Sequence, residues 1–175
     1  MTAENPDAAG FHTAVIAIGS NLGRKVENCR RAISALEALP NSRVTDTSRF
    51  YRTAPVGYRD QDWFINAAVL LETALAPLAL LHALQEIQRR AGRKRQTVRF
   101  GPRILDLDII FYDDAVIDTP ELTLPHPRMH ERRFVLQPIC DMNPAIFHPV
   151  LGERVQTLLD RIDDELQIIE PYACD

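Results

Sequence analysis

Two aspartates stand inside the otherwise apolar run of residues 101–110 (GPRILDLDII). Side chains alternate between the faces of a strand, so Asp106 and Asp108 share one face, roughly 6.5 to 7 Å apart along the chain. Two ionised carboxylates repel each other and are costly to bury unless a cation or a donor compensates them. Mg²⁺ is the simplest compensation, because one or two carboxylates plus substrate phosphates often hold it. A solvated edge strand would give the same pattern.

A basic segment, residues 92–103 (GRKRQTVRFGPR), leads directly into the aspartate pair and contains no acid. Its cationic residues are Arg93, Lys94, Arg95, Arg99 and Arg103. A run of charge often forms only a solvated surface. Its place beside two candidate metal ligands favours a polyphosphate site, because metal ions bridge phosphate oxygens while guanidinium groups neutralise their charge.

An amide interrupts a second apolar run, residues 63–73 (WFINAAVLLET). Phe64 and Asn66 are two residues apart and therefore share a face of the expected strand. An aromatic plane beside an amide could hold a flat heterocycle by stacking and by hydrogen bonds to its edge. A core phenylalanine beside an asparagine satisfied by backbone groups is the simpler interpretation, and both stay open.

His126 and His130 have a spacing that can place two metal ligands on one helical face. Pro127 argues against such a site, because the residue before a proline is disfavoured in the helical region. We interpret His126 as a hydrogen-bond donor to a phosphate or a base. Arg132 would add charge for an anion, and Phe134 is a core or stacking residue.

The composition is that of an ordinary globular chain. Its 175 residues, 46% hydrophobic and 25% charged, suit one domain with a real core. No apolar run approaches the roughly 20 residues of a membrane span, and no signal peptide is visible, so we expect a cytoplasmic protein. The net charge of -4 disfavours a general nucleic-acid binder. Three cysteines without CxxC spacing suggest neither a zinc site nor a disulfide framework.

The expected elements follow the order strand, helix, strand, strand, helix, strand. The strands are expected at residues 13–18, 43–53, 63–73 and the aspartate run, and the helices at 26–36 and 77–91. This order predicts an α+β, ferredoxin-like fold: an antiparallel sheet with both helices packed on one face and the other face free.

The flanking segments complete the expected architecture. Residues 1–12 are expected to form a mobile N-terminal tail, and 13–175 a single domain. GSNLG (19–23) matches neither dinucleotide nor P-loop patterns and is interpreted as a turn. After the last strand of the sheet we expect a β-excursion (112–124), a short helix (128–137), a loop (138–152) and a C-terminal helix (155–162).

The motifs resemble those of the 6-hydroxymethyl-7,8-dihydropterin pyrophosphokinase family of the folate pathway. The similarity runs from about Val15 to Gly152, through AIGSNLG, FYRTAPVG, DQDWFINAAV, GRKRQTVRFGPRILDLDII and LPHPRMHERRFVLQP. The resemblance implies transfer of the pyrophosphoryl group of ATP to the hydroxymethyl oxygen of 6-hydroxymethyl-7,8-dihydropterin, with AMP leaving. It implies two Mg²⁺ ions, and we expect a monomer without nucleic-acid or membrane partners.

The resemblance also implies roles for individual residues. The catalytic residues would be Arg93, Arg103, Asp106 and Asp108, with both aspartates holding metal. The ATP-binding residues would be Gln85, Gln88, Arg95, Arg99, Ile109, Thr123, His126 and Arg132. The pterin-binding residues would be Thr53, Val56, Phe64, Asn66 and Phe134. Gln88 stands where relatives usually have Glu, and Phe100 where they usually have Trp, which affects the expected nucleotide contacts.

Two other classes of protein remain as alternatives. An RNA-binding module could use aromatic residues and the basic segment on a ferredoxin-like sheet, but it leaves the aspartate pair unexplained. A metal-dependent hydrolase or nucleotidyltransferase could use the same pair. AMP release that depends on a pterin alcohol separates all three.

Overall fold

The computed structural model describes residues 10–92 and 101–173. Its centre is a 6-stranded antiparallel sheet in the order β10-β3-β4-β1-β5, with β2 also paired to β4. The strands are β1 (His12–Ser20), β2 (Ser42–Thr47), β3 (Tyr51–Thr53), β4 (Phe64–Thr73), β5 (Asp106–Tyr112) and β10 (Ile169–Pro171). In this described part of the chain, none of the helices is long and apolar enough to cross a membrane.

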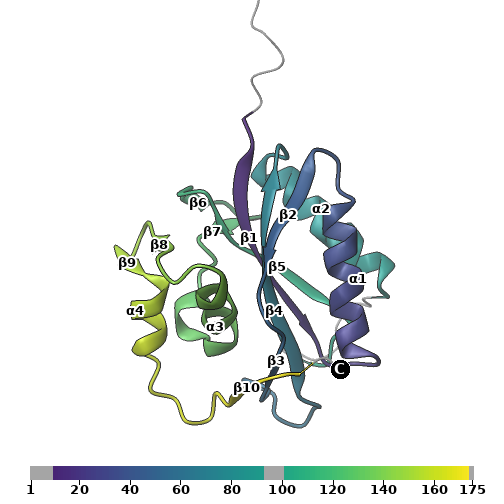
Figure 1. Ribbon diagram of the computed structural model, residues 1–175, viewed down its shortest axis with the longest axis vertical. Coiled ribbons are helices and arrows are strands. Elements are labelled where there is room, and N and C mark those ends of the chain that lie inside the picture. The colour runs from purple at the N-terminus through teal and green to yellow at the C-terminus, as the bar shows by residue number, and fades with distance from the viewer. Residues whose placement is uncertain (1–9, 93–100, 174–175) are drawn as a thin grey trace, which may run out of the picture.

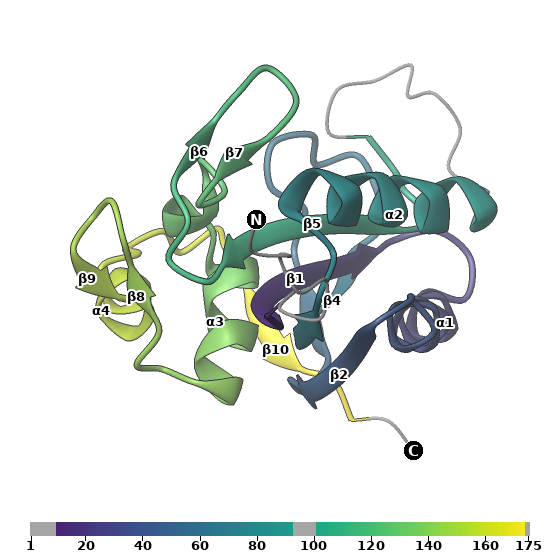
Figure 2. The same ribbon diagram turned by 90° about the horizontal axis from the view of Figure 1, so that it is seen from above.

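The helices form a layer on each side of the sheet, as Figures 1 and 2 show. On one face lie α1 (Lys25–Glu37) and α2 (Pro77–Arg90), and on the other α3 (Arg133–Met142) and α4 (Val155–Asp160). Strand order and helix positions on the first face confirm the predicted ferredoxin-like arrangement.

Alternating side chains explain why the sheet can face two layers. Ile16, Ile18, Leu107 and Ile109 point toward α1 and α2 and join the larger core, together with Leu84 of α2. Burial of such side chains stabilises the fold by about 1.5 to 3 kcal/mol each. The leucines that flank the aspartates therefore do face a core, as the alternation predicted.

The expectation that the other face of the sheet is free is wrong for the part beneath α3. There Val15, Ala68 and Ile110 pack with Leu136 and Ile139 of α3 in a second core. The apolar face of α3 is stable only when it is buried against another element, and this part of the sheet buries it. The remaining part of the face stays available for a site.

The single strand predicted over residues 43–53 is interrupted at Ser48. The Ser48 N–H donates to Ala68 O at 2.9 Å, and the Ala68 N–H donates to the Ser48 hydroxyl at 2.9 Å. Because the hydroxyl takes the place of a strand carbonyl, the chain bends, and the strand resumes as β3 at Tyr51. Both β2 and β3 pair with β4.

Strand β10 covers the outer edge of β3. Ile169 pairs with Thr53 and Pro171 with Tyr51 in antiparallel register. Two more backbone bonds extend the pairing, from Ala54 N to Ile168 O at 3.0 Å and from Tyr172 N to Phe50 O at 2.8 Å. The sequence patterns did not predict this strand.

The segment after β5 matches the prediction in part. Strands β6 (Ile117–Asp118) and β7 (Thr123–Leu124) form the expected β-excursion. The expected helix at 128–137 instead begins with a 3₁₀ turn (Met129–Glu131) and continues as α3 through Pro138. Pro138 removes only the N–H that would reach one helix carbonyl, and its ring is buried. Strands β8 (Phe147–His148), inside the expected loop, and β9 (Glu153–Arg154), directly after it, then pair as a hairpin.

The predicted tail ends differently from expectation. Its first nine residues lie outside the described residues, but His12 already belongs to β1 and pairs with Thr73. The His12 Nδ1 atom lies 2.6 Å from the Asp113 carboxylate. The strand therefore begins one residue before the predicted start at Thr13.

Candidate active site

A pocket of about 270 Å³ opens where α3 leaves the sheet uncovered. Its floor is the central strand β1, whose residues on this side are Val15, Ala17 and Gly19. Val15 packs beneath α3, whereas Ala17 and Gly19 carry little or no side chain and line the pocket. Gly19 pairs with Asn66 of β4 on one side and Asp106 of β5 on the other. The small residues of β1 thus leave an open space between the polar side chains of β4 on one side and those of β5 on the other.

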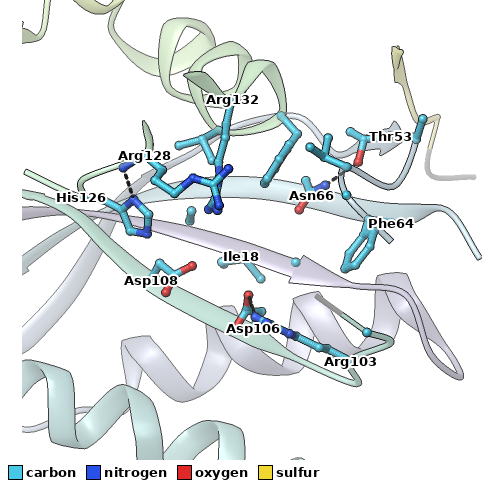
Figure 3. A pocket seen from close by; sticks show the side chains of 18 residues that line it. Ile18, Thr53, Phe64, Asn66, Arg103, Asp106, Asp108, His126, Arg128 and Arg132 are labelled. Atoms are coloured by element: carbon cyan, nitrogen blue, oxygen red, sulfur yellow. Dashed lines mark hydrogen bonds and ion pairs between the residues drawn. The ribbon is translucent and has the colours of Figure 1, made fainter. Parts of the chain in front are cut away.

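The aspartates form one wall of the pocket. Asp106 and Asp108 point to the pocket side of β5 (Figure 3), because the residues between and around them point into the core. The Arg103 Nη1 donates to Asp106 Oδ2 at 2.5 Å, and both side chains are only about a fifth exposed. Arg103 therefore compensates part of the negative charge that the sequence placed here.

A basic wall faces the aspartates from the segment between β7 and α3. His126, Arg128 and Arg132 all line the pocket. Burial, followed by the charges of Arg132 and Arg128, lowers the pKa of His126 to about 4. The His126 Nδ1 accepts the Arg128 N–H at 3.2 Å, so the proton of the neutral ring sits on Nε2. His126 is thus a neutral hydrogen-bond donor at neutral pH.

Arg132 lies among charges of both signs. Burial first, and then repulsion by Arg128, lower the pKa of Arg132, while Asp108 and Asp106 oppose that shift. An arginine keeps its charge despite such shifts. Its guanidinium is therefore a partly desolvated cation placed opposite two carboxylates, which is a suitable position for binding an anion between them.

The other end of the pocket is neutral. The Asn66 Nδ2 donates to Thr53 Oγ1 at 2.6 Å, and both residues are buried. A Cβ atom at Gly19 would lie 2.7 Å from Asn66 Oδ1, so only glycine leaves room for this amide. Figure 3 shows the amide oxygen pointing into the pocket. Asn66 is therefore fixed in one orientation by a hydroxyl rather than by backbone groups.

Apolar side chains complete this neutral end. Phe64 of β4, Phe134 of α3 and Val56 after β3 line the pocket. Both phenylalanines are partly exposed, and among the described residues Phe64 belongs to neither hydrophobic core. An aromatic ring beside a fixed amide suits a flat heterocycle better than it suits core packing.

The pocket brings together ten of the residues predicted from the sequence. These are Thr53, Val56, Phe64, Asn66, Arg103, Asp106, Asp108, His126, Arg132 and Phe134. Arg93, Arg95 and Arg99 lie outside the described residues. The residues around the aspartates and around the amide, which are far apart in sequence, therefore belong to one site.

Four predicted nucleotide contacts do not line this pocket. Gln88 is buried, where its Oε1 accepts the Leu107 N–H at 3.1 Å and its Nε2 donates to Leu84 O at 3.2 Å. This side chain links α2 to β5. Ile109 is in the larger core, Thr123 pairs within the β-excursion, and Gln85 is exposed on α2.

Asn21 connects two segments of the chain, a role that we did not predict when we interpreted GSNLG as a turn. It is 1% exposed, and its Oδ1 accepts the Arg103 N–H at 2.7 Å. Its Nδ2 donates to Gln61 Oε1 at 2.8 Å and to Asp62 O at 3.1 Å. One amide thus joins the segment before the aspartates to the loop between β3 and β4. No local pattern distinguishes such an asparagine from an ordinary turn residue.

The sequence patterns also did not lead us to predict Arg128 and Gly19 as site residues, although the sequence around each contains an indication of such a role. Arg128 follows His126 by two residues in a basic segment. Gly19 continues the decreasing size at every second position of β1, from valine to alanine to glycine. Both line the pocket.

Comparison with a protein family and its members gives consistent matches. Residues 15–144 match the model of the 7,8-dihydro-6-hydroxymethylpterin-pyrophosphokinase (HPPK) family. The 2-amino-4-hydroxy-6-hydroxymethyldihydropteridine pyrophosphokinase of Haemophilus influenzae is 40% identical over 151 residues, which are 85% of this chain and 94% of that protein. The enzyme of the same name from Bacillus subtilis is 45% identical over 129 residues, covering 74% of this chain and 77% of that protein.

Longer proteins also contain a similar unit. The folic acid synthesis protein fol1 of Schizosaccharomyces pombe is 39% identical over 152 residues, which are 87% of this chain but 21% of that protein. A crystal structure of wild-type Plasmodium falciparum HPPK-DHPS with pteroate has a TM-score of 0.71 and 17% identity, and covers 92% of this chain and 43% of that chain. At that identity the likeness shows the fold alone.

Proposed function

The chain belongs to the 7,8-dihydro-6-hydroxymethylpterin-pyrophosphokinase family, as a pyrophosphokinase of folate biosynthesis, and we propose that the pocket on its sheet holds both substrates. The reaction transfers the pyrophosphoryl group of ATP to 6-hydroxymethyl-7,8-dihydropterin. The observation that carries the proposal is the division of one pocket into a charged end and a neutral end. The charged end suits phosphates, and the neutral end suits a flat ring.

The charged end fits Mg²⁺. Asp106 and Asp108 supply two carboxylates, and no group of three or more His, Cys, Asp or Glu residues suited to a metal occurs among the described residues. Mg²⁺ is commonly held by one or two carboxylates together with substrate phosphates, so a larger cage is not required. We propose that the pair holds two ions with ATP. When bound, they would neutralise and align the phosphate chain.

The protein's own groups would stabilise the charge on the transferred group. The hydroxymethyl oxygen bonds to the β-phosphorus and loses its proton to a base or to water, while the bond between that phosphorus and the oxygen of the leaving AMP breaks. Arg103 and Arg132 lie on opposite sides of the aspartates and can each donate to phosphate oxygens. His126 donates through Nε2 without adding charge. Positioning and charge neutralisation carry most of the catalysis in reactions of this kind.

The neutral end would fix the pterin. Phe64 and Phe134 line the pocket and would stack on the ring, while Asn66 presents its amide oxygen to an N–H on the ring edge. Thr53 holds that amide in place by a hydrogen bond, and Gly19, which has no side chain, leaves the room that the amide oxygen occupies. A preorganised edge contact gives specificity, because a ligand without the matching donor leaves buried polar groups unpaired.

We also propose that one chain carries the whole site, so that the protein acts as a monomer. The residues of one chain suffice to form both the charged end and the neutral end of the pocket. Light scattering across a range of protein concentrations tests this. A dimer with full activity and an inactive monomer would contradict it.

An AMP-release assay tests the function directly. With Mg²⁺ and ATP, we expect AMP to form only when 6-hydroxymethyl-7,8-dihydropterin is present, together with one pterin diphosphate per AMP. A matched reaction with the 6-methyl pterin, which lacks the attacking hydroxyl, should form no AMP. AMP formation independent of the pterin alcohol would indicate a hydrolase and overturn the proposal.

A further inference from the structure

Arg128 lines the pocket beside His126 and Arg132. A 3₁₀ turn holds it between His126 and Arg132, and Met129, which is 0% exposed, anchors that turn in the second core. The Arg128 N–H donates to His126 Nδ1 at 3.2 Å. The backbone around Arg128 is therefore fixed by the same contacts that orient His126.

The charges around Arg128 favour an anion. Arg128, His126 and Arg132 line the same pocket, and the charge of Arg128 contributes to the lowered pKa of the other two. Two neighbouring guanidinium groups repel each other in a partly desolvated site. A phosphate between them removes that repulsion and accepts hydrogen bonds from both.

One protein contact of Arg128, its ion pair with Glu131, is weak enough to be replaced. The Arg128 Nε lies 3.6 Å from Glu131 Oε2, and both side chains are about half exposed. Surface ion pairs of this kind contribute little to stability. Glu131 is thus a competitor that a phosphate oxygen can displace.

The position of Arg128 along the pocket indicates which phosphate it meets. The His126 N–H donates to Ile110 O at 2.9 Å, so this segment lies beyond Asp108 along β5. Asn66 lies at the opposite end, across Gly19 from Asp106. Figure 3 shows the same order, with the aspartates between the two ends. A pterin at the Asn66 end attacks the β-phosphorus from that side, so the leaving AMP lies toward Arg128.

We propose that Arg128 binds the nucleotide phosphates at the AMP end of the pocket, exchanging Glu131 for a phosphate oxygen. This inference rests on the proposed function, because that function places the pterin at the Asn66 end. It adds a phosphate-binding residue on the side of the leaving AMP.

Three variants test the proposal by calorimetric titration with MgATP and with AMP. Arg128→Gln should weaken the binding of both ligands by roughly 3- to 10-fold, because it removes one half-exposed charge-assisted hydrogen bond. Glu131→Gln should tighten both, because it removes the competitor. Arg24→Gln is the matched control: Arg24 pairs with Glu27 at the same i,i+3 spacing, 3.3 Å apart, outside the pocket. It should change neither affinity, and pterin binding should stay constant in all three variants.

Two results would overturn the inference. Unchanged MgATP affinity in Arg128→Gln shows that the guanidinium does not meet the phosphates. Weaker MgATP binding in Glu131→Gln shows that the pair is a structural contact. If the melting curve shows that Arg128→Gln does not fold, the MgATP affinity of Glu131→Gln decides the question. Tighter MgATP binding in Glu131→Gln would support the proposal, and unchanged or weaker binding would contradict it. If the wild-type protein releases no AMP from ATP in the presence of the pterin alcohol, the result would instead contradict the proposed function.

Discussion

Single side chains decide which end of the pocket is charged. Asp106 and Asp108 occupy positions of β5 that could have held apolar residues, and Arg103 and Arg132 compensate them. Burial of unmatched carboxylates is costly, so the site retains them with compensating cations beside them. The aspartates are therefore expected to matter for the reaction more than for the fold.

Replacing either aspartate tests this division. Asp106→Asn and Asp108→Asn should each nearly abolish AMP formation, because each removes a carboxylate charge that the proposed metal site needs. Melting temperatures should change little, since the apolar side of β5 stays intact. Full turnover in either variant would contradict the metal assignment.

The neutral end permits a comparison of binding with stability. Asn66→Ala should weaken pterin binding by about 1 to 3 kcal/mol through groups left unpaired. Phe64→Ala and Phe134→Ala should lose stacking with modest loss of folding stability, whereas the control Phe111→Ala, at a position 3% exposed, should cost about 3 to 5 kcal/mol of stability. Large losses of stability with unchanged pterin affinity would assign Phe64 and Phe134 to core packing alone, a role for which Phe134 already has contacts in the second core.

At the scale of elements, one amide holds two pocket segments together. Asn21 at the end of β1 binds both the backbone of Arg103 and the loop residues Gln61 and Asp62. Asn28 of α1 adds a bond from Nδ2 to Ile104 O at 3.3 Å. The start of β5 is therefore placed by contacts with the β1–α1 region rather than by its own sequence.

Asn21→Ala should show this positioning role in the kinetics. We expect kcat to fall, because Arg103 and Asp106 lose their position relative to the loop between β3 and β4. Stability should fall by about 1 to 3 kcal/mol, because buried polar groups lose their partners. Asn28→Ala is the control for stability, since its bonds reach only the β5 side of the pocket and its own turn. Equal kcat losses in both variants at equal stability would contradict a specific role of Asn21 in joining the two segments.

Sequence patterns predicted the elements whose signal is local. The alternation around Asp106 and Asp108 predicted both the strand and the face that the two aspartates share. For Phe64 and Asn66 the local pattern left core packing and a heterocycle site both open, and both side chains line the pocket. The contacts of Asn21 join residues 40 and 82 positions away in sequence, and no local pattern contains them. The break at Ser48 likewise depends on a partner in β4, so the sequence suggested one strand where there are two.

At the scale of the whole molecule, buried histidines make stability depend on pH. Burial is the main cause of the lowered pKa values of His126, about 4, and of His148, whose Nδ1 accepts the Leu151 N–H at 3.1 Å. The unfolded chain binds protons near the ordinary value of 6.5, whereas the folded chain does not. Stability is therefore complete above about pH 6.5 and falls as the pH drops toward 4.

Urea unfolding at several pH values measures this dependence. We expect the free energy of unfolding to be constant from pH 8 to 7 and to fall between pH 6.5 and 5, a window that lies above the titration of ordinary carboxylates. His126→Gln should reduce the slope in that window. An unchanged slope would show that His126 takes up protons equally in the folded and unfolded states.

The pairing of β10 with β3 has a consequence for how copies of the protein meet one another. A bare strand edge is a template for a strand of another molecule, which is a common route to aggregation. Ile169 and Pro171 occupy that edge, and the same pairing fixes Thr53, which orients Asn66. A chain cut after Gln167 should therefore self-associate as its concentration rises, detectable by light scattering, and lose pterin affinity together with that change. In the intact chain strand β10 is the outermost strand of the sheet, and Pro171, which has no N–H to donate, makes it a poorer template for another copy than β3 would be.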